Sequence, residues 1–316
     1  MLQVREVVKT YDGRPVVNRV SFDVEAGEIF ALLCPNGAGK TTLIRMITDI
    51  LKPDSGTIQL DGHAVTDAKR PEIAYLPEER GLYRKSKVLE VLSYYGRLKG
   101  MRGPDANRNA TRLLERVGLA EWAQKPVMAL SKGMQQKVQL CTALIGDPRL
   151  LILDEPFSGL DPINVQLLED VLRERRAAGT TILLSTHQMN KVEEQCDRAL
   201  MINRGHMVLY GKVGEMRTRY SDHAVRVRGA AIPDAVPGVL SSVPHGADVV
   251  MKLEPSATPA AVLRALLDRG AQVESYSVET LPLEDLFVKV VHEGLGLDRG
   301  QSGPPTMDEI LVGVGR

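Results

Sequence analysis

The chain has 316 residues, 43% hydrophobic and 25% charged, which is ordinary for a globular protein and excludes disorder throughout. Its 40 Lys and Arg residues balance 40 Asp and Glu residues, so a dedicated nucleic-acid binder is disfavoured. No apolar run reaches the roughly 18 residues of a membrane span, and the first residues lack the apolar stretch of a secretory signal. The widely spaced Cys34, Cys141 and Cys196 argue against a disulfide framework or a zinc site and indicate a reduced, cytosolic protein.

The first part of the chain predicts short strands around a glycine-rich loop. Apolar residues alternate, the Asp12-Gly13 dipeptide suits a turn, and Glu28–Leu33 is a compact apolar run typical of a buried strand. A helical pattern follows the glycine-rich stretch. We therefore expect strands at residues 2–8, 16–24, 28–33 and 56–60, and a helix from residue 41 to about residue 50.

The middle of the chain, residues 84–145, has the apolar spacing of helices. Strand and helix patterns alternate beyond it. They predict strands at 150–153 and 181–185, helices at 165–176 and 189–195, and a hairpin at 199–210. Such alternation implies a mainly parallel sheet covered on both faces, so we expect an α/β domain with a helical insertion.

A second, smaller α+β unit is expected nearer the C-terminus. Its patterns predict strands at 224–227, 248–253 and 272–278, an extended segment at 236–243, and helices at 259–268 and 283–292. We place the first domain at 1–215, with its helical subdomain at about 84–145, and the accessory domain at 220–292. Residues 293–316, rich in Gly and Pro, are expected to form a flexible tail.

The stretch CPNGAGKTT, residues 34–42, lies between a buried strand and a helix, which is the setting of a phosphate-binding loop. Gly37 and Gly39 allow backbone N–H groups to close around phosphates placed at a helix N-terminus. Lys40 is positioned to bridge the terminal phosphates, and the Thr41 hydroxyl to ligate Mg²⁺. The loop therefore predicts a nucleoside triphosphate and Mg²⁺ as ligands.

Cys34 stands where the phosphate-loop pattern has its first glycine. One interpretation is a degenerate loop that no longer binds. The other is that position 34 ends the strand and tolerates a Cβ, so that binding survives, and we favour it. An exposed thiol beside a helix N-terminus would also be more acidic than usual, which leaves a redox role open.

Further motifs follow at regular intervals. LSKGMQQK, residues 130–137, precedes a helix, and the apolar strand at 150–153 ends in Asp154 and Glu155, which is the Walker B arrangement. Asp154 is suited to hold Mg²⁺ through water, and Glu155 to orient and deprotonate an attacking water. Asp161 comes next, and His187 ends the following strand.

In this order and spacing the motifs resemble the nucleotide-binding domain of ABC transporters over residues 1 to about 215, with LSKGMQ in place of the commoner LSGGQ. The resemblance implies a P-loop NTPase core with an antiparallel β-subdomain and a helical insertion. It implies ATP hydrolysis coupled to transport by two such subunits, identical or paired, arranged head to tail. A separate integral-membrane permease is implied as partner, with no nucleic acid, and a cytoplasmic location on the inner face of the cell membrane.

The resemblance also implies residue roles. Glu155 and His187 become the catalytic residues, with His187 linking the γ-phosphate to the glutamate, and Asp161 contacts the partner subunit. A histidine at a strand end could otherwise be a packing residue. The expected ATP-binding residues are Tyr11, Asn36, Gly37, Ala38, Gly39, Lys40, Thr41 and Thr42. The residues expected to reach the partner's ATP are Ser131, Lys132, Gly133, Met134 and Gln135.

Two positions keep alternatives open. Tyr11 lies where the family places an aromatic ring against adenine, and we favour that role over the alternative, a tyrosine that anchors a loop. Glu78 takes the place of the family's Q-loop glutamine, which touches Mg²⁺. A carboxylate is a harder metal ligand, so we expect Mg²⁺ near Thr41, Glu78 and Asp154. The competing interpretation is that Glu78 only forms a solvated loop pair with Glu79.

The segments PEERGLY (77–83) and LSKGMQQK, and the C-terminal LPLEDLFVKV, resemble bacterial export-type ATPases with a small accessory domain, similar to those of sodium or drug efflux. An exporter subunit is therefore the leading hypothesis. One alternative is a nucleotide-binding regulatory module with impaired turnover, in which Cys34 and Glu78 are the lesions. Another is a soluble ABC ATPase acting on ribosomes or DNA, which one such domain and zero net charge disfavour.

Overall fold

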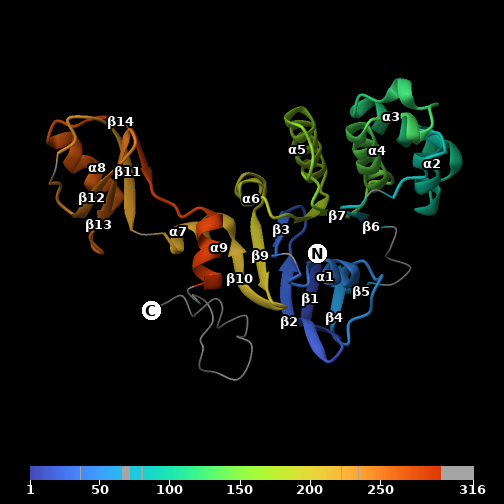
Figure 1. The fold of residues 1–316 in the computed structure, drawn as a ribbon, viewed down its shortest axis with the longest axis horizontal. Helices are drawn as coiled ribbons and strands as arrows, with labels where there is room; N and C mark the ends of the chain where they lie inside the picture. Colours follow the sequence, from blue (N-terminus) through green and yellow to red (C-terminus); the bar gives the residue numbers. More distant parts are fainter. Residues whose placement is uncertain (36, 66–71, 80, 222, 234, 293–316) are drawn as a thin grey trace. The chain divides into compact units, whose positions relative to one another are not determined.

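The computed structural model describes residues 1–35, 37–65, 72–79, 81–221, 223–233 and 235–292, and the expected tail at 293–316 and Asn36 lie outside these ranges. The chain divides into two compact units, one covering Met1–Lys212 and the other beginning at Val213 (Figure 1). No helix in the described ranges combines the length and apolar character that crossing a membrane requires.

The first unit is built on a six-stranded sheet with the order β10-β9-β3-β8-β7-β6. All neighbouring strands run parallel except β10, which pairs antiparallel with β9. The strands are β3 (Ile29–Leu33), β6 (Ile73–Leu76), β7 (Leu150–Asp154), β8 (Thr181–Ser185), β9 (Arg198–Asn203) and β10 (His206–Lys212). Because β3, β7 and β8 are parallel, their carboxyl ends meet at one edge, where Asp154 pairs in register with Ser185.

An antiparallel sheet with the order β2-β1-β4-β5 belongs to the same unit. Its strands are β1 (Leu2–Tyr11), β2 (Arg14–Val24), β4 (Ser55–Leu60) and β5 (His63–Ala64). Phe22 of β2 stacks on Phe30 of β3 with ring centroids 5.4 Å apart, so the two sheets share one apolar core. Helix α1 (Lys40–Ile47) buries Leu43 and Ile44 in that core.

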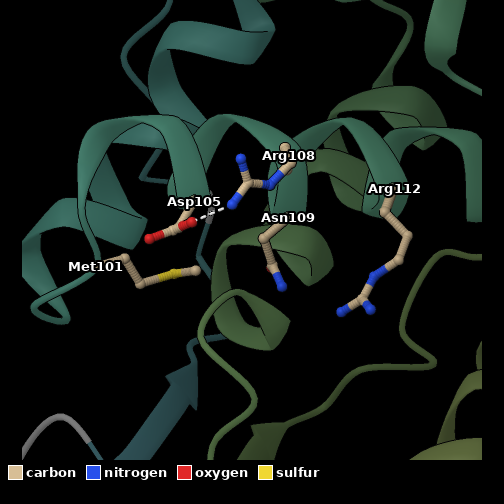
Figure 2. A pocket seen from close by; sticks show the side chains of 5 residues that line it. All are labelled: Met101, Asp105, Arg108, Asn109 and Arg112. Atoms are coloured by element: carbon tan, nitrogen blue, oxygen red, sulfur yellow. Dashed lines mark hydrogen bonds and ion pairs between the residues drawn. The ribbon is translucent and has the colours of Figure 1, made fainter.

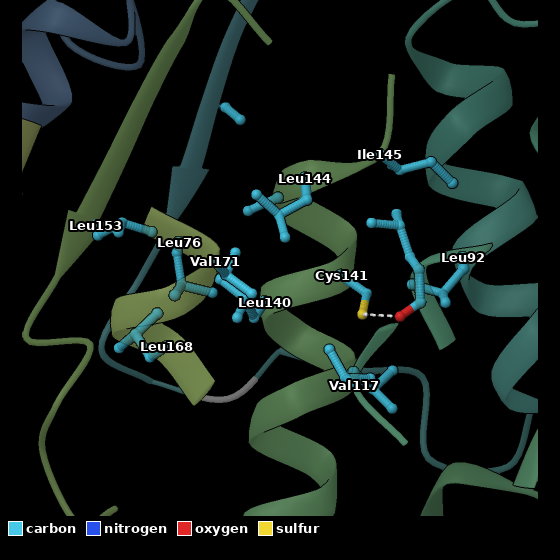
Figure 3. Packing of buried hydrophobic residues seen from close by; sticks show 14 of the residues in the cluster. Leu76, Leu92, Val117, Leu140, Cys141, Leu144, Ile145, Leu153, Leu168 and Val171 are labelled. Carbon is cyan, nitrogen blue, oxygen red and sulfur yellow. Dashed lines mark hydrogen bonds between the residues drawn. The ribbon is translucent and has the colours of Figure 1, made fainter. Parts of the chain in front are cut away.

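The helical part of this unit contains α2, α3 and α4, which lie together in Figure 1. Their bounds are Val88–Leu98, Gly103–Arg116 and Lys132–Leu144, with short 3-10 helices at Ala120–Trp122 and Val127–Ala129. Figure 3 shows their buried core, where the Cys141 thiol of α4 donates to the Leu113 carbonyl of α3 at 3.8 Å. Helices α5 (Pro162–Ala177) and α6 (Met189–Gln195) accompany the central sheet.

The second unit is an α+β fold with an antiparallel sheet in the order β12-β13-β11-β14. Its elements are α7 (Val213–Arg219), β11 (Ala224–Ala230), β12 (Val239–His245), β13 (Asp248–Leu253), α8 (Pro259–Asp268), β14 (Gln272–Val278) and α9 (Leu283–His292). Val225, Val227 and Met251 of the sheet share a buried cluster with Val262 and Leu266 of α8.

The expected fold class, an α/β core with a mainly parallel sheet, an antiparallel subdomain and a helical insertion, is confirmed. Three elements were not expected, namely helix α7, the two-residue strand β5 and the short strand β6, which precedes the loop that carries Glu78. Four residues of β6 are too few for periodicity to mark, and their pairing with β7 is what makes them a strand.

The central strand β3 should be the part of the first unit that is most sensitive to truncation. Leu32 is fully buried between neighbouring parallel strands, whereas Leu98 at the end of α2 is 62% exposed. We expect Leu32→Ala to lower the free energy of unfolding by about 2–5 kcal/mol through lost burial and an unfilled cavity. Leu98→Ala should change it by less than about 0.5 kcal/mol in the same urea titration. Equal losses in both variants would contradict the assignment of β3 to the core.

Candidate active site

The phosphate loop connects β3 to α1 at the carboxyl edge of the central sheet. Gly39, which precedes α1, has a φ of 103°, and a Cβ there would overlap the carbonyl oxygen of Val16. Only glycine meets both conditions without strain. Gly37 also has a positive φ, while Ala38 is buried, and Thr41 and Thr42 lie in the first turn of α1. The loop thus delivers backbone N–H groups and a helix N-terminus to one point, where an anion is favoured.

Cys34 continues β3 into this loop and is only 6% exposed. Its side chain belongs to the same apolar cluster as Leu32 and Ala38, which shows where the extra atoms of a cysteine are accommodated. Burial raises the pKa of the thiol to about 12. The exposed, unusually acidic thiol considered from the sequence is therefore wrong, because the side chain is buried among apolar residues.

Lys40 and Glu155 form the central contact of the site. The Lys40 Nζ atom lies 2.8 Å from Glu155 Oε1 and 3.7 Å from Asp154 Oδ1. Burial disfavours the ionised glutamate, but hydrogen bonds from Lys40 and His187 outweigh it and hold the pKa of Glu155 below its ordinary value. Burial likewise opposes the ammonium of Lys40, yet the hydrogen bond to Glu155 raises its pKa. Both groups are therefore charged near neutral pH.

His187 joins the site from the end of β8. Its Nδ1 atom lies 2.8 Å from Glu155 Oε2, and the side chain is 66% exposed, so its other face is open to solvent. The buried Thr186 hydroxyl donates to the same Oε2 at 3.3 Å. Glu155 itself has a φ of 49°, which lies in the left-handed region that residues other than glycine seldom adopt. The predicted pair of Glu155 and His187 is thus in direct contact.

Asp154 is held by two hydroxyls that the sequence analysis did not identify. Ser185 Oγ donates to Asp154 Oδ1 at 2.9 Å, and the Tyr75 hydroxyl donates to Oδ2 at 3.3 Å. Burial and the neighbouring Asp154 carboxylate raise the pKa of Tyr75 to about 12, so the phenol remains a donor. The strand order brings them there, because β6 and β8 flank β7, and no local sequence pattern marks this pairing.

The signature segment caps helix α4. Ser131 accepts a hydrogen bond from the Met134 N–H at 3.3 Å, and Gln135 Nε2 donates to the Leu130 carbonyl at 2.8 Å. Lys132 is exposed at the start of this helix, and a Cβ on Gly133 would come 3.3 Å from Asn164 Nδ2 of α5.

Two more predicted residues lie at element ends. Asp161 caps α5 through the Asn164 N–H at 2.9 Å and is exposed. Tyr11 lies at the tip of the β1–β2 hairpin, is 46% exposed, and has the Lys9 ammonium 6.0 Å from its ring centroid. The structure therefore brings Lys40, Asp154, Glu155 and His187 into contact, while Ser131, Asp161 and Tyr11 are presented on exposed ends.

A pocket of about 240 Å³ opens beside the two Walker B acids. It is lined by Leu76, Pro77, Glu78, Gln136, Gln139, Asp154, Glu155, Pro156, Ser158 and Gly159. Glu78, which is exposed on its loop, thus shares a cavity with Asp154 and Glu155. Thr41 does not line this pocket, and among the described residues no three His, Cys, Asp or Glu side chains lie close enough together to hold a metal ion, so the Mg²⁺ site at Thr41, Glu78 and Asp154 stays a prediction.

A larger hollow of about 330 Å³ lies on α3, away from this chemistry (Figure 2). It is lined by Met101, Asp105, Arg108, Asn109 and Arg112. Asp105 pairs with Arg108, as the dashed line in Figure 2 marks, and Arg112 lies 3.7 Å from Asp147. The guanidinium charges of this hollow are therefore matched by neighbouring carboxylates, and we assign it no ligand.

Comparison with known proteins gives consistent matches. Residues 17–158 match the ABC transporter family, and residues 211–291 match the C-terminal domain of DrrA1-3-like ATP-binding proteins. The uncharacterized ABC transporter ATP-binding protein YhaQ of Bacillus subtilis is 35% identical over 294 residues, covering 92% of this chain and 98% of YhaQ.

Two further matches agree. The linearmycin resistance ATP-binding protein LnrL of Bacillus subtilis is 32% identical over 255 residues, covering 79% of this chain and 82% of LnrL. A solved structure of the ATP-binding subunit of an ABC transporter superimposes with a TM-score of 0.66 at 33% identity, covering 70% of this chain and 93% of that structure.

The lowered pKa of Glu155 predicts a pH dependence of stability. A carboxyl whose pKa is lower in the folded state stabilises the fold above its unfolded pKa, and this contribution is lost as the pH falls through the folded value. The difference in free energy of unfolding between wild type and Glu155→Gln should therefore shrink from about pH 6 to about pH 3. The same comparison in a Lys40→Met background should show a smaller change. A difference that is constant with pH would contradict the ion pair.

Proposed function

Because this chain belongs to the ABC transporter ATP-binding proteins, we propose that it is the ATP-hydrolysing subunit of an export-type transporter. The observation that carries the proposal is the contact of Glu155 with both Lys40 and His187 beside the phosphate loop. A carboxylate held between a phosphate-binding lysine and a histidine is suited to activate water against a bound triphosphate. The name of the relative LnrL, a resistance protein, supports the direction of export.

We infer that ATP binding replaces Glu155 by the phosphates as the partner of the Lys40 ammonium. In the structure this ammonium neutralises Glu155, and the β- and γ-phosphates take it over when they enter the loop. Glu155 is then left with His187 and Thr186, and its carboxylate becomes free to accept a proton. The ion pair thus keeps the general base occupied until substrate is present.

Hydrolysis follows as in-line attack by water. The water oxygen forms a bond to the γ-phosphorus, its proton goes to Glu155, and the bond from phosphorus to the β–γ bridging oxygen breaks. ADP leaves with the bonding electron pair, and inorganic phosphate is the second product. His187, whose far side is exposed, is placed to hydrogen-bond the γ-phosphate while it orients Glu155.

Thr41, Asp154 and Glu78 would hold Mg²⁺, which when bound neutralises charge that develops on the phosphates. The chain's own contribution is to fix these ligands. Ser185 and Tyr75 set the direction of the Asp154 carboxylate. A fixed second layer of donors of this kind orients metal ligands.

We further infer that two copies, or a copy and a paired subunit, close head to tail around two ATP molecules. Ser131 caps an exposed helix N-terminus, which can donate N–H groups and positive potential to the partner's γ-phosphate. Asp161 is exposed at the start of α5 and is available to the partner. The exposed ring of Tyr11 is available to stack on adenine. Release after hydrolysis would move a separate membrane permease, which places the chain on the cytoplasmic face.

The proposed base gives a direct test. Glu155→Gln removes the proton acceptor but keeps the shape, so kcat for Mg-ATP hydrolysis should fall by about 100-fold or more, while a closed ATP-bound dimer accumulates. Steady-state phosphate release and light scattering measure the two effects. Glu79→Gln, an exposed neighbour of Glu78, is the matched control and should hydrolyse ATP as wild type does.

Full activity of Glu155→Gln would overturn the role of the base. Cys34→Gly tests the alternative that this chain is a nucleotide-binding module with impaired turnover. Because Cys34 is accommodated in the core, restoring glycine should leave turnover within a few-fold of wild type. An inactive wild type that becomes active in Cys34→Gly would show that the cysteine disables the loop.

The permease is tested by purification from native membranes. The tagged full chain carrying Glu155→Gln, held with ATP, should co-purify an integral-membrane protein, because the closed state is long-lived. The Lys40→Ala variant, which loses the cation that faces the phosphates, should recover less of it after the same wash. Recovery of no integral-membrane protein in either preparation would contradict the transporter assignment.

A further inference from the structure

Two of the glutamines of helix α4, Gln136 and Gln139, lie about one turn apart, and both line the pocket beside Asp154 and Glu155. Gln136 Nε2 donates to the Ser158 carbonyl at 3.0 Å. Gln139 Nε2 donates to two carbonyls, that of Pro77 at 3.1 Å and that of Glu79 at 3.0 Å. Side chains of α4 therefore hold the two loops that border the site.

The contacts of Gln139 are the more specific of the two. Its side chain is 5% exposed, and both N–H groups of its amide point at the residues on either side of Glu78. Because the carbonyl groups on both sides of Glu78 are held in place, the backbone conformation at Glu78 is restricted. The direction of its Cα–Cβ bond is restricted with it. Glu78 is exposed, so the packing of its side chain does not fix its position. The hydrogen bonds from Gln139 to the neighbouring carbonyls restrict it instead.

We propose that Gln139 is a positioning residue that sets Glu78 against Asp154 and ties its loop to the helix that begins at Ser131. This inference rests on the proposed function, since it gives Glu78 a place at the Mg²⁺ site. The position 78 glutamine of the wider family is replaced by glutamate here, and a buried amide on α4 holds its loop from behind. A movement of α4 is thereby transmitted to Glu78.

The chemistry limits what can replace Gln139. An aliphatic side chain leaves two carbonyls without their donor, and a buried acceptor without a partner is costly. A methionine is close to glutamine in length but has no N–H donor and no charge. Gln139→Leu and Gln139→Met should therefore have the same effect although their shapes differ. Gln166→Leu, which removes an exposed glutamine on α5, is the matched control.

Three measurements test the proposal on the full chain. Gln139→Leu should leave the affinity for a fluorescent ATP analogue unchanged, lower kcat by about tenfold, and raise the Mg²⁺ concentration for half-maximal hydrolysis. Hydrogen–deuterium exchange without nucleotide should become faster over residues 75–82. The double variant Glu78→Ala with Gln139→Leu should be no slower than Glu78→Ala alone, because Gln139 acts through Glu78.

Each outcome decides the question. Losses that multiply in the double variant would overturn the proposal, as would unchanged exchange over residues 75–82. If Gln139→Leu does not fold, Gln139→Met carries the same readouts. If wild type binds ATP but hydrolyses none, the proposed function fails. The hydrogen–deuterium exchange measurement then still tests whether Gln139 holds the loop of residues 77–79 through its hydrogen bonds.

Discussion

The ion pair between Lys40 and Glu155, with 2.8 Å between its charged atoms, is the interaction on which the chemistry of this chain depends. It spans two parallel strands, because Lys40 follows β3 and Glu155 follows β7 while β8 lies between them. A buried pair of this kind is stable only while both charges are present. Under the proposed function, a triphosphate that binds the Lys40 ammonium leaves the Glu155 carboxylate without this partner. His187 and Thr186 already contact the Glu155 carboxylate and remain as its partners.

The two departures from the usual motif pattern have different consequences. Cys34 affects packing, since its side chain is buried in the apolar cluster that also contains Leu32 and Ala38. Glu78 affects the charge of the site, since it lines a pocket together with Asp154 and Glu155. Under the proposed function this additional carboxylate would favour Mg²⁺, which makes the position of the Glu78 side chain important.

Helix α4 connects these features within the first unit. Its N-terminus is capped by Ser131, its middle holds the loops at Glu78 and Ser158, and its last carbonyls receive the Lys99 ammonium at 2.9 and 2.7 Å. The signature segment and the loop that carries Glu78 are therefore linked through one helix, although some fifty residues separate them in the sequence.

Sequence patterns located most of the elements and several of the residues that meet at the carboxyl edge of the sheet. Apolar periodicity located the long helices and buried strands, and Lys40, Asp154, Glu155 and His187 follow from motifs whose spacing is local to a strand end. Tertiary structure decided what depends on neighbours in space. Strand order placed Tyr75 and Ser185 on Asp154, packing turned Cys34 into the core, and the approach of α4 put Gln139 behind Glu78. None of these contacts has a periodic or spaced signature, because each joins residues from separate elements whose approach is set only when the sheet and helices pack.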